Sequence, residues 1–209
     1  MSINKVHISI AVLFIFYVVG LVGITSDHSD FFLSLTPLNL LLTLAILLVN
    51  HSDWNRVWWI FPLTAFAGLV VEIIGVNTGF PFGQYEYGWV LGPKILNTSF
   101  VIGVNWLILL YATNSMTKPL SIKSPFIRAA ISALMMVFLD FLIEPIAITL
   151  DFWSWSEPAI PMTNYLAWFV ISFILSAFWQ KSTLALNSVI GIAVFLSQLG
   201  FFGILNLVF

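Results

Sequence analysis

Three acidic residues interrupt stretches of the sequence that are otherwise apolar: Glu72, Asp140 and Glu144. A charged side chain at the centre of a membrane helix costs about 3 kcal/mol on insertion scales, so each one requires a reason. The spacing of four puts Asp140 and Glu144 on one face of a helix. Because desolvation and mutual repulsion disfavour the charged form, we expect at least one of the three to stay protonated at neutral pH. A protonated carboxylic acid beside an ionised one can act as a general acid and base pair.

A structural role is the alternative for these carboxyls. In that interpretation they bond Asn39, Asn105 or loop amides and fix the packing of the helices. We favour the catalytic interpretation, because no Lys, Arg or His is predicted at the same depth and ionisable groups inside a membrane are usually functional.

The composition defines the setting of this chemistry. The chain has 209 residues, of which 60% are hydrophobic and 8% charged, and its mean hydropathy is +1.04. A soluble domain has about a quarter of its residues charged, so the composition indicates a membrane protein. The net charge of −2 offers no basic patch for nucleic acid. The absence of Cys excludes disulfides, thiolate nucleophiles, Cys-ligated zinc and iron–sulfur clusters.

Apolar runs separated by breakers predict an all-α, polytopic transmembrane helical bundle of about seven helices, in a single integral-membrane domain over residues 1–209. The first run is too long for a signal peptide and is expected to be the first helix. The second and fourth runs are short enough to be re-entrant, so six or eight spans are alternatives. The seven runs are residues 6–24, 35–49, 57–76, 100–113, 125–148, 165–180 and 184–209.

The distribution of Lys and Arg predicts the orientation. Lys94 stands alone on one side, which makes that side the outside and places the N-terminus in the cytoplasm. Loops 77–99 and 149–164 then share the external face, and Glu72 and Glu144 should lie at about the same depth, roughly 6 Å below the outer helix ends. The other side collects six cations: Lys5, Arg56, Lys118, Lys123, Arg128 and Lys181.

The two external loops are rich in aromatic residues. The Gly and Pro residues of the first loop forbid a helix and favour a turn-rich lid folded back onto the bundle. Aromatic faces bind hydrocarbon and stabilise positive charge. An interfacial aromatic belt is the alternative for these loops, and it is favoured for Trp54, Trp58 and Trp59 at the inner edge. The candidates for substrate binding are Phe80, Phe82, Tyr85, Tyr87, Trp89, Asn105, Trp153, Trp155 and Asn164.

The central part of the chain resembles a known family. The motif TGFPFGQYEYGWVLGP follows Glu72 and Gly75, and Asp140, Glu144-Pro145 and DFWSW come later. These features resemble the integral-membrane carotenoid biosynthesis family, typified by carotenoid 1,2-hydratases and bisanhydrobacterioruberin hydratases. The family often has Asp before the Pro, where this chain keeps a carboxyl with Glu144. The resemblance implies an enzyme that adds water across the terminal double bond of an acyclic carotenoid and gives a tertiary alcohol.

The residues and the resemblance lead to one expectation. The chain is predicted to be a carotenoid 1,2-hydratase (a hydro-lyase) of the cell membrane, with Glu72, Asp140 and Glu144 as catalytic acid and base and with no metal or cofactor. The expected partners are a carotenoid substrate, the lipid bilayer and other carotenoid biosynthesis enzymes. A proton-coupled transporter of a small or lipophilic solute is the main alternative, since buried carboxyls also serve alternating access. A rhodopsin is excluded, because residues 184–209 contain no Lys for a retinal Schiff base.

Overall fold

A computed structural model describes residues 4–182 and 184–209. The side chain of Arg56, one of the six cations of the orientation prediction, lies outside this description. The described part forms eight helices and two small antiparallel sheets. The helices are α1 (Lys5–Ile24), α2 (Ser29–Ser34), α3 (Thr36–Val49), α4 (Trp54–Thr78), α5 (Ile102–Thr117), α6 (Pro125–Thr149), α7 (Met162–Lys181) and α8 (Ser188–Val208).

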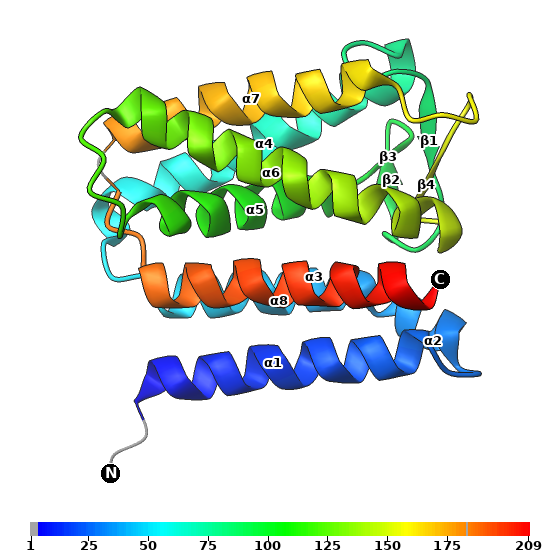
Figure 1. The fold of residues 1–209 in the computed structure, drawn as a ribbon, viewed down its shortest axis with the longest axis horizontal. Helices are drawn as coiled ribbons and strands as arrows, with labels where there is room; N and C mark the ends of the chain where they lie inside the picture. The colour runs from blue at the N-terminus through cyan, green and yellow to red at the C-terminus, as the bar shows by residue number, and fades with distance from the viewer. Residues whose placement is uncertain (1–3, 183) are drawn as a thin grey trace.

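The seven longer helices lie side by side along a common direction, and successive ones run in opposite senses (Figure 1). The N-terminus and the C-terminus therefore lie at opposite ends of the bundle. The loops after α4 and α6 lie at the same end as the C-terminus, as predicted for the two aromatic loops. Five of the helices are long and apolar enough to cross a membrane: α1, α4 from Val57, α6, α7 and α8. The prediction of an all-α, multi-pass membrane fold is confirmed in this form, whereas the count of seven spans and the orientation stay predictions.

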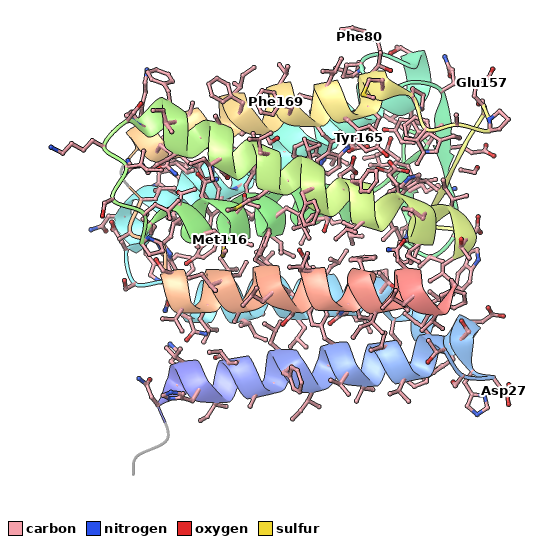
Figure 2. The ribbon with its side chains drawn as sticks, viewed as in Figure 1. Asp27, Phe80, Met116, Glu157, Tyr165 and Phe169 are labelled. Atoms are coloured by element: carbon pink, nitrogen blue, oxygen red, sulfur yellow. The ribbon has the colours of Figure 1, made fainter. Side chains whose placement is uncertain are left out.

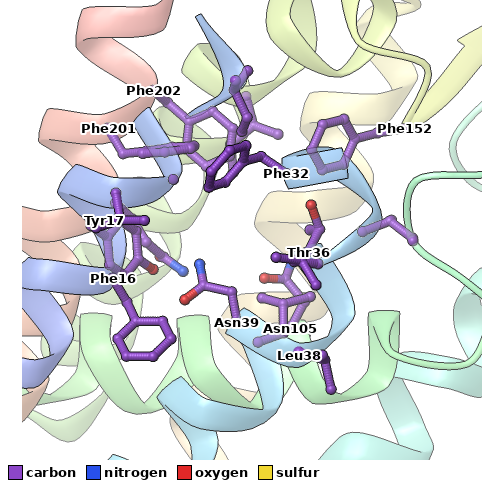
Figure 3. A pocket seen from close by; sticks show the side chains of 18 of the residues that line it. Phe16, Tyr17, Phe32, Thr36, Leu38, Asn39, Asn105, Phe152, Phe201 and Phe202 are labelled. Atoms are coloured by element: carbon purple, nitrogen blue, oxygen red, sulfur yellow. The ribbon is translucent and has the colours of Figure 1, made fainter. Parts of the chain in front are cut away.

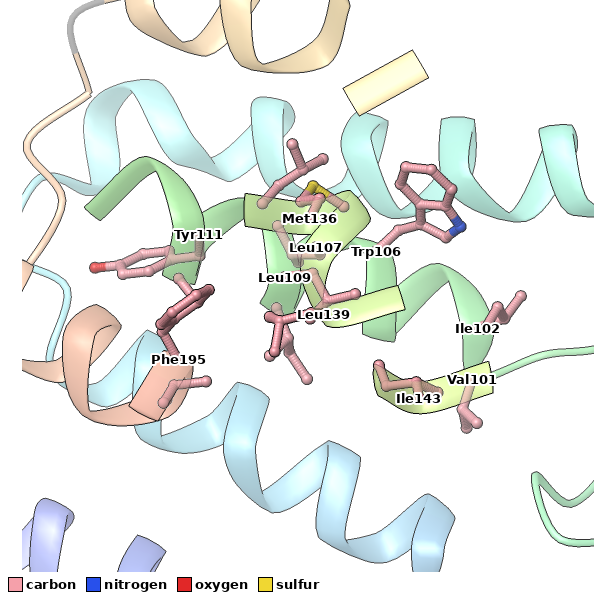
Figure 4. Close-up of a cluster of buried hydrophobic side chains, with 14 of the residues drawn as sticks. Val101, Ile102, Trp106, Leu107, Leu109, Tyr111, Met136, Leu139, Ile143 and Phe195 are labelled. Atoms are coloured by element: carbon pink, nitrogen blue, oxygen red, sulfur yellow. The ribbon is translucent and has the colours of Figure 1, made fainter. Parts of the chain in front are cut away.

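Each predicted run corresponds to one helix, and α3 and α5 are the short ones, with 14 and 16 residues. Helix α5 tolerates its short length and its polar residues because 13 of its residues are buried among the other helices. Its side chains pack against α6 and α8 in a cluster of buried apolar side chains, part of which is shown in Figure 4. Trp106, Leu109, Met136 and Leu139 are completely enclosed there.

The prediction missed three features. Helix α2 is a single short turn of helix beyond the end of α1, and its six residues are too few for a periodic signal. The first aromatic loop was predicted to be turn-rich, with no strand foreseen, but its β1 (Tyr85–Tyr87) pairs with β4 (Trp153–Trp155) in the second loop. A second small sheet pairs β2 (Lys94–Ile95) with β3 (Thr98–Ser99).

Local sequence signals set several helix ends. Ser124 and Asn187 cap the starts of α6 and α8 by accepting hydrogen bonds from backbone N–H groups. Gly79 ends α4 in the left-handed conformation, with a φ of 74°, and its N–H donates to the Gly75 carbonyl. This turn sends the chain back over the end of the bundle instead of away from it.

Candidate active site

The three carboxyls meet near the end of the bundle that carries the aromatic loops. Glu72 lies six residues before the last residue of α4, and Glu144 lies five residues before the last residue of α6. Their similar depth agrees with the sequence-based expectation. Glu72, Asp140 and Glu144 are 4%, 1% and 1% exposed. All three border one small cavity, which we call the acid pocket.

Glu72 is held by three donors. The hydroxyls of Tyr85 and Tyr87 donate to Oε2 at 2.6 and 2.7 Å, and the indole N–H of Trp106 donates to Oε1 at 2.9 Å. The Trp106 ring stacks on Trp168 with ring centroids 4.2 Å apart, which fixes its orientation.

Glu144 also accepts three hydrogen bonds. The indole N–H groups of Trp153 and Trp155 donate to Oε2 at 3.1 and 2.8 Å, and the Asn164 amide donates to Oε1 at 3.1 Å. The same Asn164 nitrogen donates to Oδ2 of Asp140 at 2.9 Å. Asn164 therefore links Asp140 and Glu144, and among the described side chains it is the one hydrogen-bond donor to Asp140.

The β1–β4 sheet delivers four of these donors together. Tyr85 pairs with Trp155, and Tyr87 pairs with Trp153. Side chains two residues apart on a strand share a face, as do directly paired residues on neighbouring strands. The patterns Tyr-Glu-Tyr and Trp-Ser-Trp consequently point four aromatic donors at the carboxyls, while Glu86 between them is exposed.

Gly75 permits the close approach of this sheet to α4. A Cβ atom at Gly75 would lie 2.6 Å from the Phe82 ring and 2.9 Å from the Tyr85 hydroxyl oxygen. Both distances are shorter than real Cβ contacts allow, so any side chain here displaces Phe82 and Tyr85. The glycine next to Glu72 in the motif therefore has a direct structural reason.

The acid pocket contains acidic side chains without a basic partner among the described residues. Within the described part of the chain, no Lys, Arg or His side chain pairs with the three carboxyls, and the ammonium of Lys94 instead donates to the Tyr87 carbonyl. Burial and then the Glu72 carboxyl raise the pKa of Tyr85 and Tyr87 well above the ordinary value for a phenol. Both hydroxyls therefore keep their protons and remain donors to Glu72.

The space among the carboxyls is small. The acid pocket encloses about 20 Å³, which is enough for about one water molecule. Nine of the twelve residues predicted for the site line it. The lining residues are Glu72, Phe82, Tyr85, Tyr87, Ile102, Asp140, Glu144, Trp153, Trp155, Asn164 and Trp168.

Three predicted residues lie elsewhere. Phe80 and Trp89 are 74% and 46% exposed, and Phe80 points away from the bundle at its outer end (Figure 2). Asn105 faces a different cavity. Of the partners expected in the structural interpretation, neither Asn39 nor Asn105 bonds a carboxyl, whereas an amide of the predicted loop 149–164, that of Asn164, does. Among the described residues, no group of His, Asp and Glu side chains is arranged to hold a metal ion.

Sequence reasoning missed Trp106, Trp168 and Ile102. Trp106 follows directly after Asn105, and the sequence does not show which of the two faces the carboxyls because α5 is buried on all sides. The one usable signal was the general rule that a buried indole N–H needs an acceptor.

Comparison with known proteins shows the family to which the chain belongs. The family model described as "Carotenoid biosynthesis protein" matches residues 34–209. The chain therefore belongs to the carotenoid biosynthesis protein family. This confirms the resemblance drawn from the motif around Glu72 and from the later carboxyls.

One curated relative is bisanhydrobacterioruberin hydratase of Haloarcula japonica. The two sequences are 27% identical over 111 residues, which cover 47% of this chain and 36% of the relative. The match thus spans little more than a third of the relative's length. No solved structure matches the chain.

Proposed function

We propose that the chain adds water across the terminal (1,2) double bond of an acyclic carotenoid end group and forms a tertiary alcohol. The observation that carries this proposal is the acid pocket, where three buried carboxyls surround space for one water molecule. Hydration of an alkene needs a strong acid, a site that tolerates a carbocation and a base for one water. The family membership and the name of the relative support the choice of a carotenoid and of hydration.

The hydrogen bonds support different roles for the carboxyls. Glu72 and Glu144 each accept three hydrogen bonds from neutral donors, which stabilise a carboxylate. Asp140 accepts one, from Asn164, and lies beside Glu144. Asp140 is therefore the carboxyl that holds a proton, and it acts as the general acid. Glu144 is its neighbouring base.

The reaction then proceeds in three proton transfers. The π electrons of the terminal double bond take the proton of Asp140, which leaves a tertiary carbocation and an Asp140 carboxylate. The oxygen of the water attacks this carbon while Glu144 accepts one of the water protons. Return of that proton from Glu144 to Asp140 restores the starting state, and the sum is the addition of one water without oxidation or reduction.

The aromatic side chains stabilise the carbocation. The rings of Trp153, Trp155 and Tyr85 border the acid pocket, and aromatic faces attract positive charge. The Glu72 carboxylate also borders the acid pocket and stabilises the same charge. Because this part of the bundle is enclosed, these interactions act in a low dielectric.

Expression in a carotenoid-producing host tests the proposal. Pigments from cells with the wild-type chain should include a species heavier than the host's acyclic carotenoid by one water, or by two where both ends react. Cells with Glu144→Gln at the same membrane level should contain the unmodified pigment. A pigment profile identical to that of the host without the chain, in several hosts with different acyclic carotenoids, would contradict the proposal.

We propose a location in the cell membrane with the N-terminus in the cytoplasm. Five of the six cations of the orientation prediction have described side chains, and they lie at the end opposite the acid pocket. A reporter that works only outside the cytoplasm should be active when fused at Phe209 or near Glu157 and inactive near Lys118. The reverse pattern would invert the proposed orientation.

A further inference from the structure

A second cavity lies among α1, α3, α5 and α8, outside the acid pocket. It encloses about 240 Å³, which makes it more than ten times larger than the acid pocket. Its walls are mostly apolar, and the aromatic side chains of Phe16, Tyr17, Phe32, Phe152 and Phe201 surround the space (Figure 3). We call it the chain cavity.

The chain cavity adjoins the acid pocket. Ile102 and Trp153 line both cavities, and Ile143 in the chain cavity directly precedes Glu144. The indole of Trp153 donates to Glu144 from the boundary between them. An apolar ligand in the chain cavity can therefore present one end to the carboxyls past Ile102 and Trp153.

The opposite side of the chain cavity faces the membrane. Phe16, Val19 and Leu38 line the cavity and are themselves exposed on the outside of the bundle. They belong to α1 and α3, so the opening lies between these helices. The surroundings of a bundle surface at this depth are hydrocarbon. A membrane-dissolved ligand can enter here without passing through water.

Two buried amide oxygens in the wall have no hydrogen-bond partner: Oδ1 of Asn39 and Oε1 of Gln198. Gln198 is 3% exposed, and its side chain lies beside the Tyr17 hydroxyl. An unpartnered buried acceptor carries a desolvation penalty unless a donor reaches it. A pure hydrocarbon offers no donor, but a hydroxyl group does.

We infer that the chain cavity binds the apolar chain of a ligand whose end reacts in the acid pocket, and that the amide oxygen of Asn39 or of Gln198 accepts the hydrogen bond of a hydroxyl group carried by that ligand. The inference rests on the proposed function for the identity of the reacting end. Binding itself does not require the reaction.

In the chain cavity, the wall formed by α1 and α2 lies outside the residues that the family model matches. Tyr17, Gly20, Ile24 and Phe32 line it, and all of them precede residue 34, where the match to the family model begins. The acid pocket lies wholly within the matched residues. The first two helices thus select the ligand, whereas the matched part carries the chemistry.

Two filling variants and a matched control test the cavity. Gly20→Leu projects into it, since a Cβ atom there meets only the Phe201 ring at 3.7 Å, an ordinary contact. Val19→Trp is the second filling variant, at an exposed lining position. Gly200→Leu is the control, because a Cβ atom at Gly200 on α8 has nothing within 4 Å.

The binding probes are lycopene and lycopene that carries one tertiary hydroxyl. Quenching of tryptophan fluorescence reports binding to purified protein in lipid nanodiscs, in a Glu144→Gln background where no hydration takes place. Gly20→Leu and Val19→Trp should weaken binding of both probes about tenfold or more, while Gly200→Leu should leave it unchanged. Binding of both probes to both filling variants as tight as to the control would overturn the cavity assignment.

The hydroxyl is tested in the same assay. The unfilled protein should bind the hydroxylated probe about fivefold more tightly than lycopene, as one net hydrogen bond provides. The double variant Asn39→Leu, Gln198→Leu should lose this preference and retain lycopene binding. A preference that survives in the double variant, or is absent from the unfilled protein, would overturn the role of the two amides.

Failure of this inference is distinguishable from failure of the proposed function. If the filling variants bind both probes normally while the wild-type chain hydrates pigment in cells, the chain cavity is wrong and hydration stands. If the filling variants lose binding while no host pigment gains water, the cavity stands and hydration is wrong.

Discussion

Two clusters of polar side chains are buried at opposite ends of the same helices, and they differ in kind. The acid pocket contains three carboxyls, whereas the cluster toward the end with the N-terminus, which we call the inner network, contains only neutral groups. In the inner network Ser132 donates to Thr113 at 2.8 Å and Ser176 donates to Ser132 at 3.2 Å. Its members are Thr113, Asn114, Thr117, Ser132, Ser176 and Gln180.

The difference teaches what each cluster can do. The amides of Asn114 and Gln180 donate to oxygens within the inner network, so its polar atoms satisfy one another. Such a closed, neutral network fixes helix packing. The acid pocket instead contains three carboxyls that pair with no basic side chain among the described residues, and it has room for a water molecule. Its carboxyls can therefore exchange protons with a bound substrate or water molecule.

The two clusters lie on shared helical stripes, yet apolar side chains separate them. Ser132 and Asp140 lie on one face of α6 with the buried Met136 between them. On α7, Trp168 lies between Asn164 and Ser176 of the inner network. A transporter needs a polar path from one side to the other, and these buried side chains interrupt that stripe. The geometry therefore favours an enzyme over a transporter.

Removal of a carboxyl should have the largest effect. Glu72→Gln, Asp140→Asn and Glu144→Gln keep the shape of the side chain but cannot exchange a proton, so each should lower product formation by about 100-fold or more. Pigment analysis at matched membrane levels measures this. Ser132→Ala in the inner network is the control and should retain activity. Full activity in all three carboxyl variants would make the acid pocket a structural cluster like the inner network.

A substitution at Gly75, where the β1–β4 sheet closely approaches α4, should have the second-largest effect. Gly75→Ala forces Phe82 and the Tyr85 hydroxyl away from α4, and displacement of a site by about 1 Å can lower a rate by one to two orders of magnitude. We expect at least about a tenfold loss of product for Gly75→Ala. Gly200→Ala, with nothing near its Cβ position, should match the wild type. Equal activity of the two variants would show that the sheet need not contact Glu72.

Single donors to the carboxylates should have a smaller effect. Tyr85→Phe and Trp155→Phe keep a ring but remove one hydrogen bond to Glu72 or Glu144. A hydrogen bond to a charged group contributes about 1.5 to 3 kcal/mol. Because two other donors to the same carboxylate remain, we expect the lower end of this range, which is about a tenfold fall in product formation. Trp89→Phe, in the same loop but exposed, should change it little. Equal losses in all three would favour a general aromatic belt over specific donors.

The smallest effect on activity is expected from the inner network. Asn114→Ala removes hydrogen bonds to Ser176 and Gln180 and should lower the free energy of unfolding by about 1 kcal/mol. Activity per folded molecule should stay within about twofold of the wild type, since a change on this scale leaves most molecules folded. Thermal unfolding in detergent together with pigment analysis separates the two quantities. Loss of activity without loss of stability would link the inner network to the chemistry.

Most of the fold follows from the sequence. Long apolar runs predict the helices to within a few residues, because a membrane helix must be apolar over nearly its whole length. Equal depth on α4 and α6 correctly predicts that Glu72 and Glu144 come close. The alternation in Tyr-Glu-Tyr and Trp-Ser-Trp is typical of the strands β1 and β4, but strands of three residues are too short to be predicted from one sequence.

Which side chains face the site depends on how each helix is rotated about its own axis. A nearly uniform apolar pattern does not encode this rotation. The choice of Asn105 in place of Trp106 on α5 illustrates this, since both are near the right depth and only one faces Glu72. The exposure of Phe80 and Trp89 has a related cause. In a turn-rich loop with Gly79 and Gly83 at positive φ, the direction of each side chain depends on the turns and not on a period.

The origin of the oxygen atom tests the central claim most directly. Membranes that contain the protein should be incubated with acyclic carotenoid in water enriched in a heavy oxygen isotope, without molecular oxygen or reductant. Hydration in the acid pocket predicts that the new alcohol carries the label and that the product exceeds the substrate by one water in mass. A strict requirement for molecular oxygen, or label derived from it, would contradict the account and make the chain a hydroxylase.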